Sequence, residues 1–201
     1  SQYVMRSVDG GNRWERISPS LGRSALQSLV ESPLDAKRLV AGGSGRIHFT
    51  TDSGKRWKER SKGLPNKTIR DVLASAHHPE QAYVAMSGRR DRDCTSYLYA
   101  TGDYGQNWKS IASNLPNEPV NAIAEDPKTP GLLFAGTDLG VYVSLDSGAH
   151  WESLSASLPT CPVVDIAVHG RDGALVAATH GQSLFILDIN NIRKAKDSNN
   201  R

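Results

Sequence analysis

The sequence predicts an all-β fold of repeated antiparallel units, and three features of the chain support this prediction. The first is an eight-residue pattern, Ser/Thr-x-Asp-x-Gly-x-x-Trp, which occurs four times and contains every tryptophan. The second is its spacing, because its aspartates are separated by 43, 51 and 43 residues. The third is that short runs rich in Val, Ile and Tyr alternate with Gly, Pro and Asp turns, as in β-strands. A unit that recurs about every 40–50 residues is typical of a propeller or a solenoid.

Each copy of the pattern predicts the tip of a β-hairpin. The aspartate side chain can accept hydrogen bonds from backbone amides, and the glycine can adopt the positive φ of a tight turn. The tryptophan begins the returning strand, where its ring covers apolar surface. Four tips spread around an edge cannot converge on one ligand, so we expect a structural role for these residues: Asp9, Gly11, Trp14, Asp52, Gly54, Trp57, Asp103, Gly105, Trp108, Asp146, Gly148 and Trp151.

The segments between the hairpin tips read as groups of short strands, and four antiparallel strands make one propeller blade. The expected organisation is a hairpin over residues 3–17 and blades over about residues 26–61, 69–112, 120–155 and 163–189. The last blade has three expected strands. These segments form one domain over residues 1–192, with about four to five blades, followed by a basic polar tail over residues 193–201.

The repeated pattern resembles the Asp-box, or BNR repeat, of sialidases, xyloglucanase-like glycosidases and sortilin-type receptors. The likeness covers about residues 3–189, and residues 133–137, 140–144 and 178–181 resemble segments of large bacterial BNR-repeat glycosyl hydrolase-like proteins. The ending departs from that family at Gln182 and Ser183, where an Arg-Gly pair is usual. The resemblance implies the C-terminal part of a larger propeller. It also implies a secreted protein, extracellular or periplasmic, although the chain itself carries no signal peptide.

Composition narrows the classes of partner. The formal net charge is +3, with 22% charged residues, and no Lys/Arg-rich block is interleaved with aromatic residues, as nucleic-acid binding would require. No apolar run approaches the roughly 18 residues of a membrane span. Cys94 and Cys161 are too few for a disulfide framework. We therefore expect neither a nucleic-acid nor a membrane partner. The resemblance instead implies a glycan, peptide or protein ligand.

Strand order divides the loops between two edges of the predicted propeller. The Asp-boxes lie on one edge, and the resemblance implies that the opposite edge carries ligands near the central channel. The insertion over residues 89–94 accounts for the longer spacing of 51 residues, and its arginines could grip an anionic or hydroxyl-rich ligand through forked donors. Alternatively, its charges pair with one another in a solvated loop. The candidate ligand-binding residues are Arg46, Arg89, Arg90, Arg92, Asp138, His180 and Gln182.

The same edge offers little for catalysis. Glycoside hydrolysis needs two carboxylates about 5–10 Å apart, and we find Asp91, Asp93, Asp138 and Glu118 with no sign that any two are paired across a cleft. His77 and His78 are adjacent in the sequence and lack a third ligand at a suitable spacing. We therefore name no catalytic residue, no metal and no cofactor.

Two interpretations of function remain. The first is a non-catalytic Asp-box propeller module that acts as an interaction scaffold or as a glycan- or peptide-binding surface. The second is the C-terminal portion of a glycoside hydrolase of the xyloglucanase or sialidase type, with its catalytic residues upstream. In both, further blades or a partner chain would complete the ring.

Overall fold

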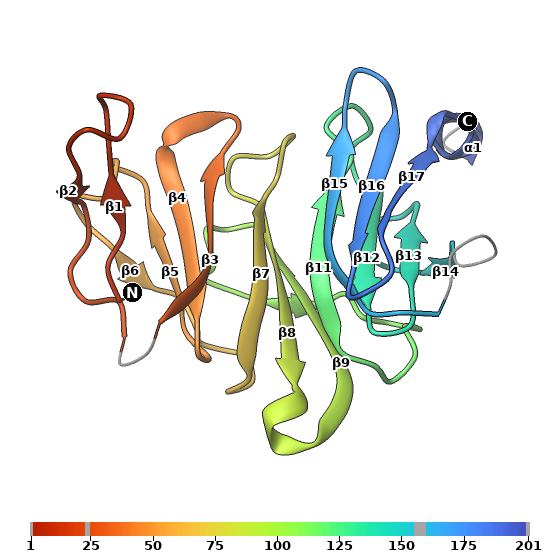
Figure 1. The fold of residues 1–201 in the computed structure, drawn as a ribbon, viewed down its shortest axis with the longest axis horizontal. Coiled ribbons are helices and arrows are strands. Elements are labelled where there is room, and N and C mark those ends of the chain that lie inside the picture. Colours follow the sequence, from red (N-terminus) through yellow and green to blue (C-terminus); the bar gives the residue numbers. More distant parts are fainter. Residues whose placement is uncertain (1, 23–24, 155–159, 200–201) are drawn as a thin grey trace.

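The computed structural model describes residues 2–22, 25–154 and 160–199. In these residues 17 strands form five antiparallel sheets, which follow one another from the N-terminal hairpin to the C-terminal sheet (Figure 1). The all-β class and the blade architecture are therefore confirmed. The expected end of the third blade at residue 155 lies outside the described residues.

The sheets follow the repeat pattern of the sequence. The N-terminal hairpin consists of β1 (Met5–Arg6) and β2 (Glu15–Arg16). Blade 1 contains β3 (Leu26–Ser32), β4 (Asp35–Gly43), β5 (Ile47–Thr50) and β6 (Lys58–Glu59). Blade 2 contains β7 (Thr68–Ala74), β8 (Ala82–Gly88), β9 (Asp93–Thr101) and β10 (Lys109–Ser110). Blade 3 contains β11 (Val120–Glu125), β12 (Leu133–Thr137), β13 (Val141–Ser144) and β14 (Glu152–Ser153). Blade 4 contains β15 (Val163–His169), β16 (Ala174–Thr179) and β17 (Leu184–Asp188).

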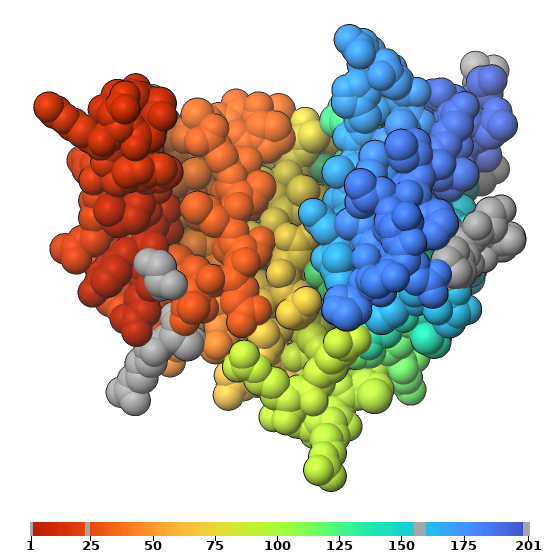
Figure 2. Space-filling view, viewed as in Figure 1, coloured from red at the N-terminus to blue at the C-terminus, as the bar shows by residue number. Residues whose placement is uncertain are grey.

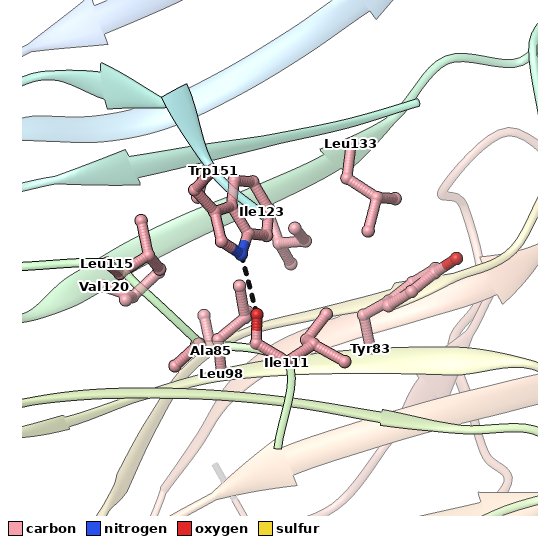
Figure 3. Close-up of a cluster of buried hydrophobic side chains, with 11 residues drawn as sticks. Tyr83, Ala85, Leu98, Ile111, Leu115, Val120, Ile123, Leu133 and Trp151 are labelled. Carbon is pink, nitrogen blue, oxygen red and sulfur yellow. Dashed lines mark hydrogen bonds between the residues drawn. The ribbon is translucent and has the colours of Figure 1, made fainter. Parts of the chain in front are cut away.

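The core lies between blades, where apolar faces of adjacent sheets meet. Figure 3 shows the cluster between blades 2 and 3, in which Tyr83 and Leu98 face Ile123, Leu133 and Trp151. Small residues on the second strands permit this close approach. A Cβ atom at Gly136 would lie 2.8 Å from Cγ1 of Val163 in the next blade. Bulkier side chains at such positions would force the blades apart.

The first strand of each blade carries a β-bulge at the same place. The register shifts at Gln27 in β3, Arg70 in β7, Asn121 in β11 and Val164 in β15. Because a bulge disrupts the ladder, it leaves backbone groups that need other partners. The carboxylate of Asp71 accepts a hydrogen bond from the backbone amide of Ile123 in the next blade, at 3.1 Å. Side chains beside the bulges therefore help to join consecutive blades along the inner strands.

Each Asp-box forms the tip between the last two strands of its sheet, and in the second, third and fourth boxes the glycine and the tryptophan contact the preceding sheet. In the third box, Nε1 of Trp108 donates to the backbone oxygen of Arg60 at 2.7 Å. A Cβ atom at Gly105 would lie 2.7 Å from the Phe49 ring and 2.8 Å from Cβ of Arg60. The glycine thus supplies a close inter-blade contact as well as a positive φ of 78°. Only the positive φ was predicted from the sequence.

The two ends of the row expose apolar side chains. At the N-terminal end Trp14 is 62% exposed and Val8 is 86% exposed. At the other end Leu184 and Ile186 of β17 are 67% and 75% exposed. The N-terminal hairpin and blade 4 lie at opposite sides of the molecule (Figure 1), so these two surfaces do not cover each other.

The described residues of the expected basic polar tail belong to helix α1 (Asn190–Asn199), which the sequence analysis did not expect. Arg193 pairs with the fully buried carboxylate of Asp126, with Nε 2.5 Å from Oδ2. The ammonium group of Lys196 donates to the backbone oxygen of Leu145. A buried carboxylate requires a charged or hydrogen-bonding partner, so these cations are held against blade 3. Residues 200 and 201 lie outside the described range.

Candidate ligand-binding edge

The loops that join the second strand to the third strand of each blade share one edge, which we call the loop edge. They span residues 44–46, 89–92, 138–140 and 180–183. The longest is in blade 2, where β8, the 3₁₀ helix η1 (Arg89–Asp91) and β9 project beyond the other loops (Figure 2). The loop edge contains all seven ligand-binding candidates from the sequence.

The blade 2 insertion is held in place by one lysine. Nζ of Lys67 lies 2.9 Å from a carboxylate oxygen of Asp91 and 2.9 Å from one of Asp93. Asp93 also accepts a hydrogen bond of 2.7 Å from the hydroxyl of Tyr97. Hydrogen bonds to Asp91 and Asp93 raise the pKa of Lys67, and those from Tyr97 and Lys67 lower the pKa of Asp93. The acidic side chains of the insertion therefore pair with Lys67 rather than with its arginines.

Arg89 of the insertion crosses to the next blade. Its Nε donates to Oδ2 of Asp138 at 3.1 Å, and its terminal nitrogen contacts the same oxygen. Asp138 also accepts a hydrogen bond of 2.9 Å from Nδ2 of Asn121. The pair raises the pKa of Arg89, mainly through the hydrogen bond to Asp138. Two of the predicted candidates are thus in contact, and Asp138 offsets the charge of Arg89.

Arg90 lies in a different environment, beside a small pocket between blades 1 and 2. The pocket has a volume of about 90 Å³ and is lined by Gln27, Thr68, Arg70, Ser87, Arg89 and Arg90. Within residues 2–22, 25–154 and 160–199, no carboxylate pairs with Arg70 or Arg90. Arg70 was not among the candidates predicted from the sequence, because its position depends on the bulge in β7, which turns an inner-strand residue toward this pocket.

The other candidates do not join this pocket. Arg46 pairs with Glu59 at 2.5 Å, beside a separate groove of about 430 Å³. His180 and Gln182 are exposed on the loop between β16 and β17, and the backbone amide of His180 donates to the oxygen of Pro162 at 2.8 Å. Arg92 is exposed and has a left-handed backbone with φ 55°. The structure thus separates the seven candidates into several groups.

Two carboxylates at the β12–β13 loop, Asp138 of the loop edge and the neighbouring Glu118, are already engaged. Buried Glu118 accepts hydrogen bonds from the amide of Leu139 at 2.8 Å and from the hydroxyl of Tyr142 at 2.9 Å. Asp138 is bound by Arg89 and Asn121, as described above. Burial and the Glu118 hydrogen bond together raise the pKa of Tyr142 to about 12. These contacts fix the β12–β13 loop, which is a structural role.

In the part of the chain that the structure describes, no group of three or more His, Cys, Asp or Glu side chains is arranged to hold a metal ion. No helix in the same residues is long and apolar enough to span a membrane.

The family model described as sortilin, neurotensin receptor 3 matches residues 2–117, which include the first three Asp-boxes and all strands of blades 1 and 2. The chain belongs to the sortilin–Vps10 family. No curated protein matches this sortilin–Vps10 chain.

Solved structures with similar folds are propellers of several kinds. An ancestral GH74 enzyme superposes on the sortilin–Vps10 chain with a TM-score of 0.72 and 16% identity, over 89% of this chain and 25% of that one. The GH74 xyloglucanase from Xanthomonas campestris gives 0.65 and 13%, over 85% and 30%. The β-propeller domain of Cps50 (Swd1) from Myceliophteria thermophila gives 0.65 and 15%, over 90% and 56%. The chain spans less than a third of the two GH74 chains, and identities this low establish a common fold only.

Proposed function

We propose that this part of a sortilin–Vps10 protein is a non-catalytic binding module that holds an acidic group of a glycan or peptide at the loop edge. The observation that carries the proposal is the pocket between blades 1 and 2, where Arg70 and Arg90 stand without a carboxylate partner among the described residues. Guanidinium groups bind carboxylates, sulfates and phosphates through paired N–H donors.

Arg89 forms part of the pocket wall but is not counted as a donor to the ligand. Asp138 offsets its charge and fixes the position of its side chain. Thr68 and Ser87 add hydroxyl groups to the lining. An oxyanion between Arg70 and Arg90 would therefore receive charged hydrogen bonds from two arginines of blade 2, each worth about 1.5–3 kcal/mol.

The engaged carboxylates support a non-catalytic role. Glu118 is buried and hydrogen-bonded to Leu139 and Tyr142, and Asp138 is bound by Arg89. A glycosidase instead needs one carboxyl group to transfer a proton and a second that acts as base or nucleophile. The alternative function is a portion of a glycoside hydrolase whose catalytic residues lie elsewhere in the protein. The fold likeness to GH74 enzymes favours that alternative.

The two functions can be separated in one set of measurements. We expect the chain to bind acidic members of a glycan and peptide array and to leave xyloglucan oligosaccharides intact. The variant Arg70→Gln/Arg90→Gln should weaken that binding at least tenfold, since each 1.4 kcal/mol corresponds to a factor of ten. Arg92→Gln is the matched control, because Arg92 lies in the same insertion but outside the pocket lining. Unchanged binding by the double variant, or cleavage of xyloglucan by this chain, would contradict the proposal.

We further propose that the protein is extracellular or periplasmic and that additional blades or a partner chain cover its two open ends. The exposed Trp14 at one end and the exposed Leu184 and Ile186 at the other support the second part, because a neighbouring blade or a partner chain would bury these apolar side chains. Sedimentation at micromolar concentration tests it, and a stable monomer with a cooperative melt would argue for an isolated arc.

A further inference from the structure

A second groove lies on the opposite edge of the molecule, between the Asp-boxes of blades 1 and 2. It has a volume of about 460 Å³, which is in the range of small-molecule sites of roughly 300–1,000 Å³. Four of its lining side chains are basic and one is acidic. The lining comprises Arg38, Phe49, Thr50, Thr51, Asp52, Arg56, Lys58, Arg60, Tyr104 and Gln106.

The one carboxylate of this groove is occupied. Oδ1 of Asp52 accepts hydrogen bonds from Thr50 Oγ1 at 2.9 Å and from the Arg56 amide at 2.8 Å. Its Oδ2 accepts a hydrogen bond from Nε of Arg56 at 2.9 Å. Within the described residues, no carboxylate pairs with Lys58 or Arg60. Asp52 therefore offsets the charge of Arg56 only, and the charges of Lys58 and Arg60 have no carboxylate partner among the described residues.

Arg38 is held in a fixed orientation with one donor unused. Its Nε lies 3.1 Å from Oδ2 of Asp35, and its guanidinium carbon lies 5.3 Å from the centre of the Tyr104 ring. Its Nη1 atom is buried and has no hydrogen-bond partner in the described part of the chain. A buried guanidinium donor without an acceptor costs free energy, and an anion in the groove would supply that acceptor.

Comparison among the repeats indicates that the fold does not require these arginines. Arg60 stands three residues after the box tryptophan, where the other boxes have Ile17, Ile111 and Leu154. In blades 1 and 2, the backbone oxygens of Lys37 and Glu80 accept a hydrogen bond from the Asp-box turn. The next residue is Arg38 in blade 1 and Gln81 in blade 2. Because the scaffold tolerates Ile and Gln at these positions, the two arginines need an explanation beyond packing.

Tyr104 is also a residue that the turn itself does not require, since two other boxes have serine at this position. It has a left-handed backbone with φ 59°, as do Ser53 and Ser147 at the same place in their boxes. A bulky side chain is unfavourable in this conformation. At this position it places an aromatic ring beneath the Arg38 guanidinium, which stabilises the cation at the groove. The strained position is thus used to orient a positive charge.

We propose that this groove binds a small ligand that carries a sulfate or phosphate ester, with Arg38, Lys58 and Arg60 as its charged donors. Tetrahedral oxyanions present several acceptor oxygens to forked and ammonium donors. The volume of the groove leaves room for the organic part of the ligand as well. This site is separate from the Arg70–Arg90 pocket on the loop edge, since the two linings share no residue.

Binding can be tested by calorimetric titration of the whole chain with glucose 6-sulfate and with glucose 6-phosphate. Unesterified glucose, inorganic sulfate and inorganic phosphate form the comparison arms. We expect the esters to bind at least tenfold more tightly than glucose, and the better of the two esters identifies the preferred oxyanion. The variant Arg38→Gln/Arg60→Ile, which carries the residues of Gln81 and Ile111 in the other repeats, should weaken ester binding at least tenfold.

The control variant Arg13→Gln/Lys194→Gln removes two exposed cations that lie outside the groove lining, and we expect it to bind like the wild type. Urea unfolding checks that both double variants remain folded. No binding of either ester, or equal weakening in the two double variants, would overturn the proposal. Because the loop-edge pocket is proposed to take acidic groups as well, the titrations are repeated in the Arg70→Gln/Arg90→Gln background, where Arg38→Gln/Arg60→Ile should still weaken ester binding at least tenfold. A failure of the loop-edge pocket is then distinguishable from a failure of this groove.

Discussion

The Asp-box of the N-terminal hairpin and the three boxes that follow it have the same turn but different surroundings. In the first, the Ser7 hydroxyl accepts from the Gly11 amide at 2.8 Å, and Oδ1 of Asp9 accepts from the Arg13 amide at 2.9 Å. In the fourth, Ser144 accepts from Gly148 at 2.8 Å, in a buried position. The polar half of the pattern therefore forms whether or not a sheet precedes it.

The glycine and the tryptophan behave differently. In the second, third and fourth boxes, the indole N–H donates to a backbone oxygen of the preceding sheet, at 2.9, 2.7 and 2.7 Å. The first box has no preceding sheet in this chain. Its Trp14 is 62% exposed, and a Cβ atom at Gly11 would meet nothing within 4 Å. The comparison divides the pattern into a local turn, made by the hydroxyl and the aspartate, and a docking part, made by the glycine and the tryptophan.

Tryptophan truncation is expected to give the largest difference between the boxes. Trp151 is 3% exposed and packs in the cluster of Figure 3, so Trp151→Ala should cost about 3–5 kcal/mol in the free energy of unfolding. Trp14→Ala, at the exposed position, should change it by less than about 0.5 kcal/mol. Urea unfolding followed by circular dichroism measures both. Similar costs for the two variants would mean that docking between blades is not what the tryptophan provides.

Glycine substitution gives a smaller contrast that isolates the close contact. Gly11 and Gly148 have φ of 92° and 88°, so alanine at either position pays a similar backbone cost of about 1–2 kcal/mol. Only at Gly148 would the new Cβ meet a neighbour, Cβ of Ile111 at 2.7 Å. We expect Gly148→Ala to cost about 1–3 kcal/mol more than Gly11→Ala. The same urea measurement gives the difference, and equal costs would show that turn geometry alone selects glycine.

The repeated pattern was sufficient to predict the blades because hairpin tips depend on local hydrogen bonds and on strand alternation. Contacts between repeats were less accessible. The partner of Trp151 lies 40 residues earlier, at Ile111, and no local pattern indicates that distance. Helix α1 was missed for a related reason. Arg193 reads as a solvated charge until Asp126, which lies 67 residues away and is fully buried, is known to face it.

The candidate site was predicted only in part, and for the same physical reason. Loop positions follow from strand order, which is why Arg89 and Arg90 were placed on one edge. Charge compensation does not follow from strand order, so the pairing of Arg89 with Asp138 across 49 residues was not predicted. Arg70 escaped because a bulge changes which side of a strand a residue faces. The groove around Arg38 was not predicted because residues of two different Asp-boxes line it, and their proximity appears only in the folded chain.

Acid titration tests the half of the pattern that all four boxes share, and we expect the smallest effect here. The amide and side chain of Asn107 hold the pKa of Asp103 at about 2, and the Arg56 amide and side chain hold that of Asp52 at about 2. The amide of Arg13 and the hydroxyl of Ser7 lower the pKa of Asp9 in the same direction. Because the folded-state pKa is depressed, the stabilisation is fully present above the unfolded value of about 3.9 and is lost as pH falls through about 2.

The three carboxyl groups can be followed by NMR between pH 5 and pH 1.5, with urea midpoints measured at each pH and Asp103→Asn as the control that should flatten the profile. An Asp9 that titrates at its ordinary value while Asp52 and Asp103 do not would mean that even the turn depends on a neighbouring blade.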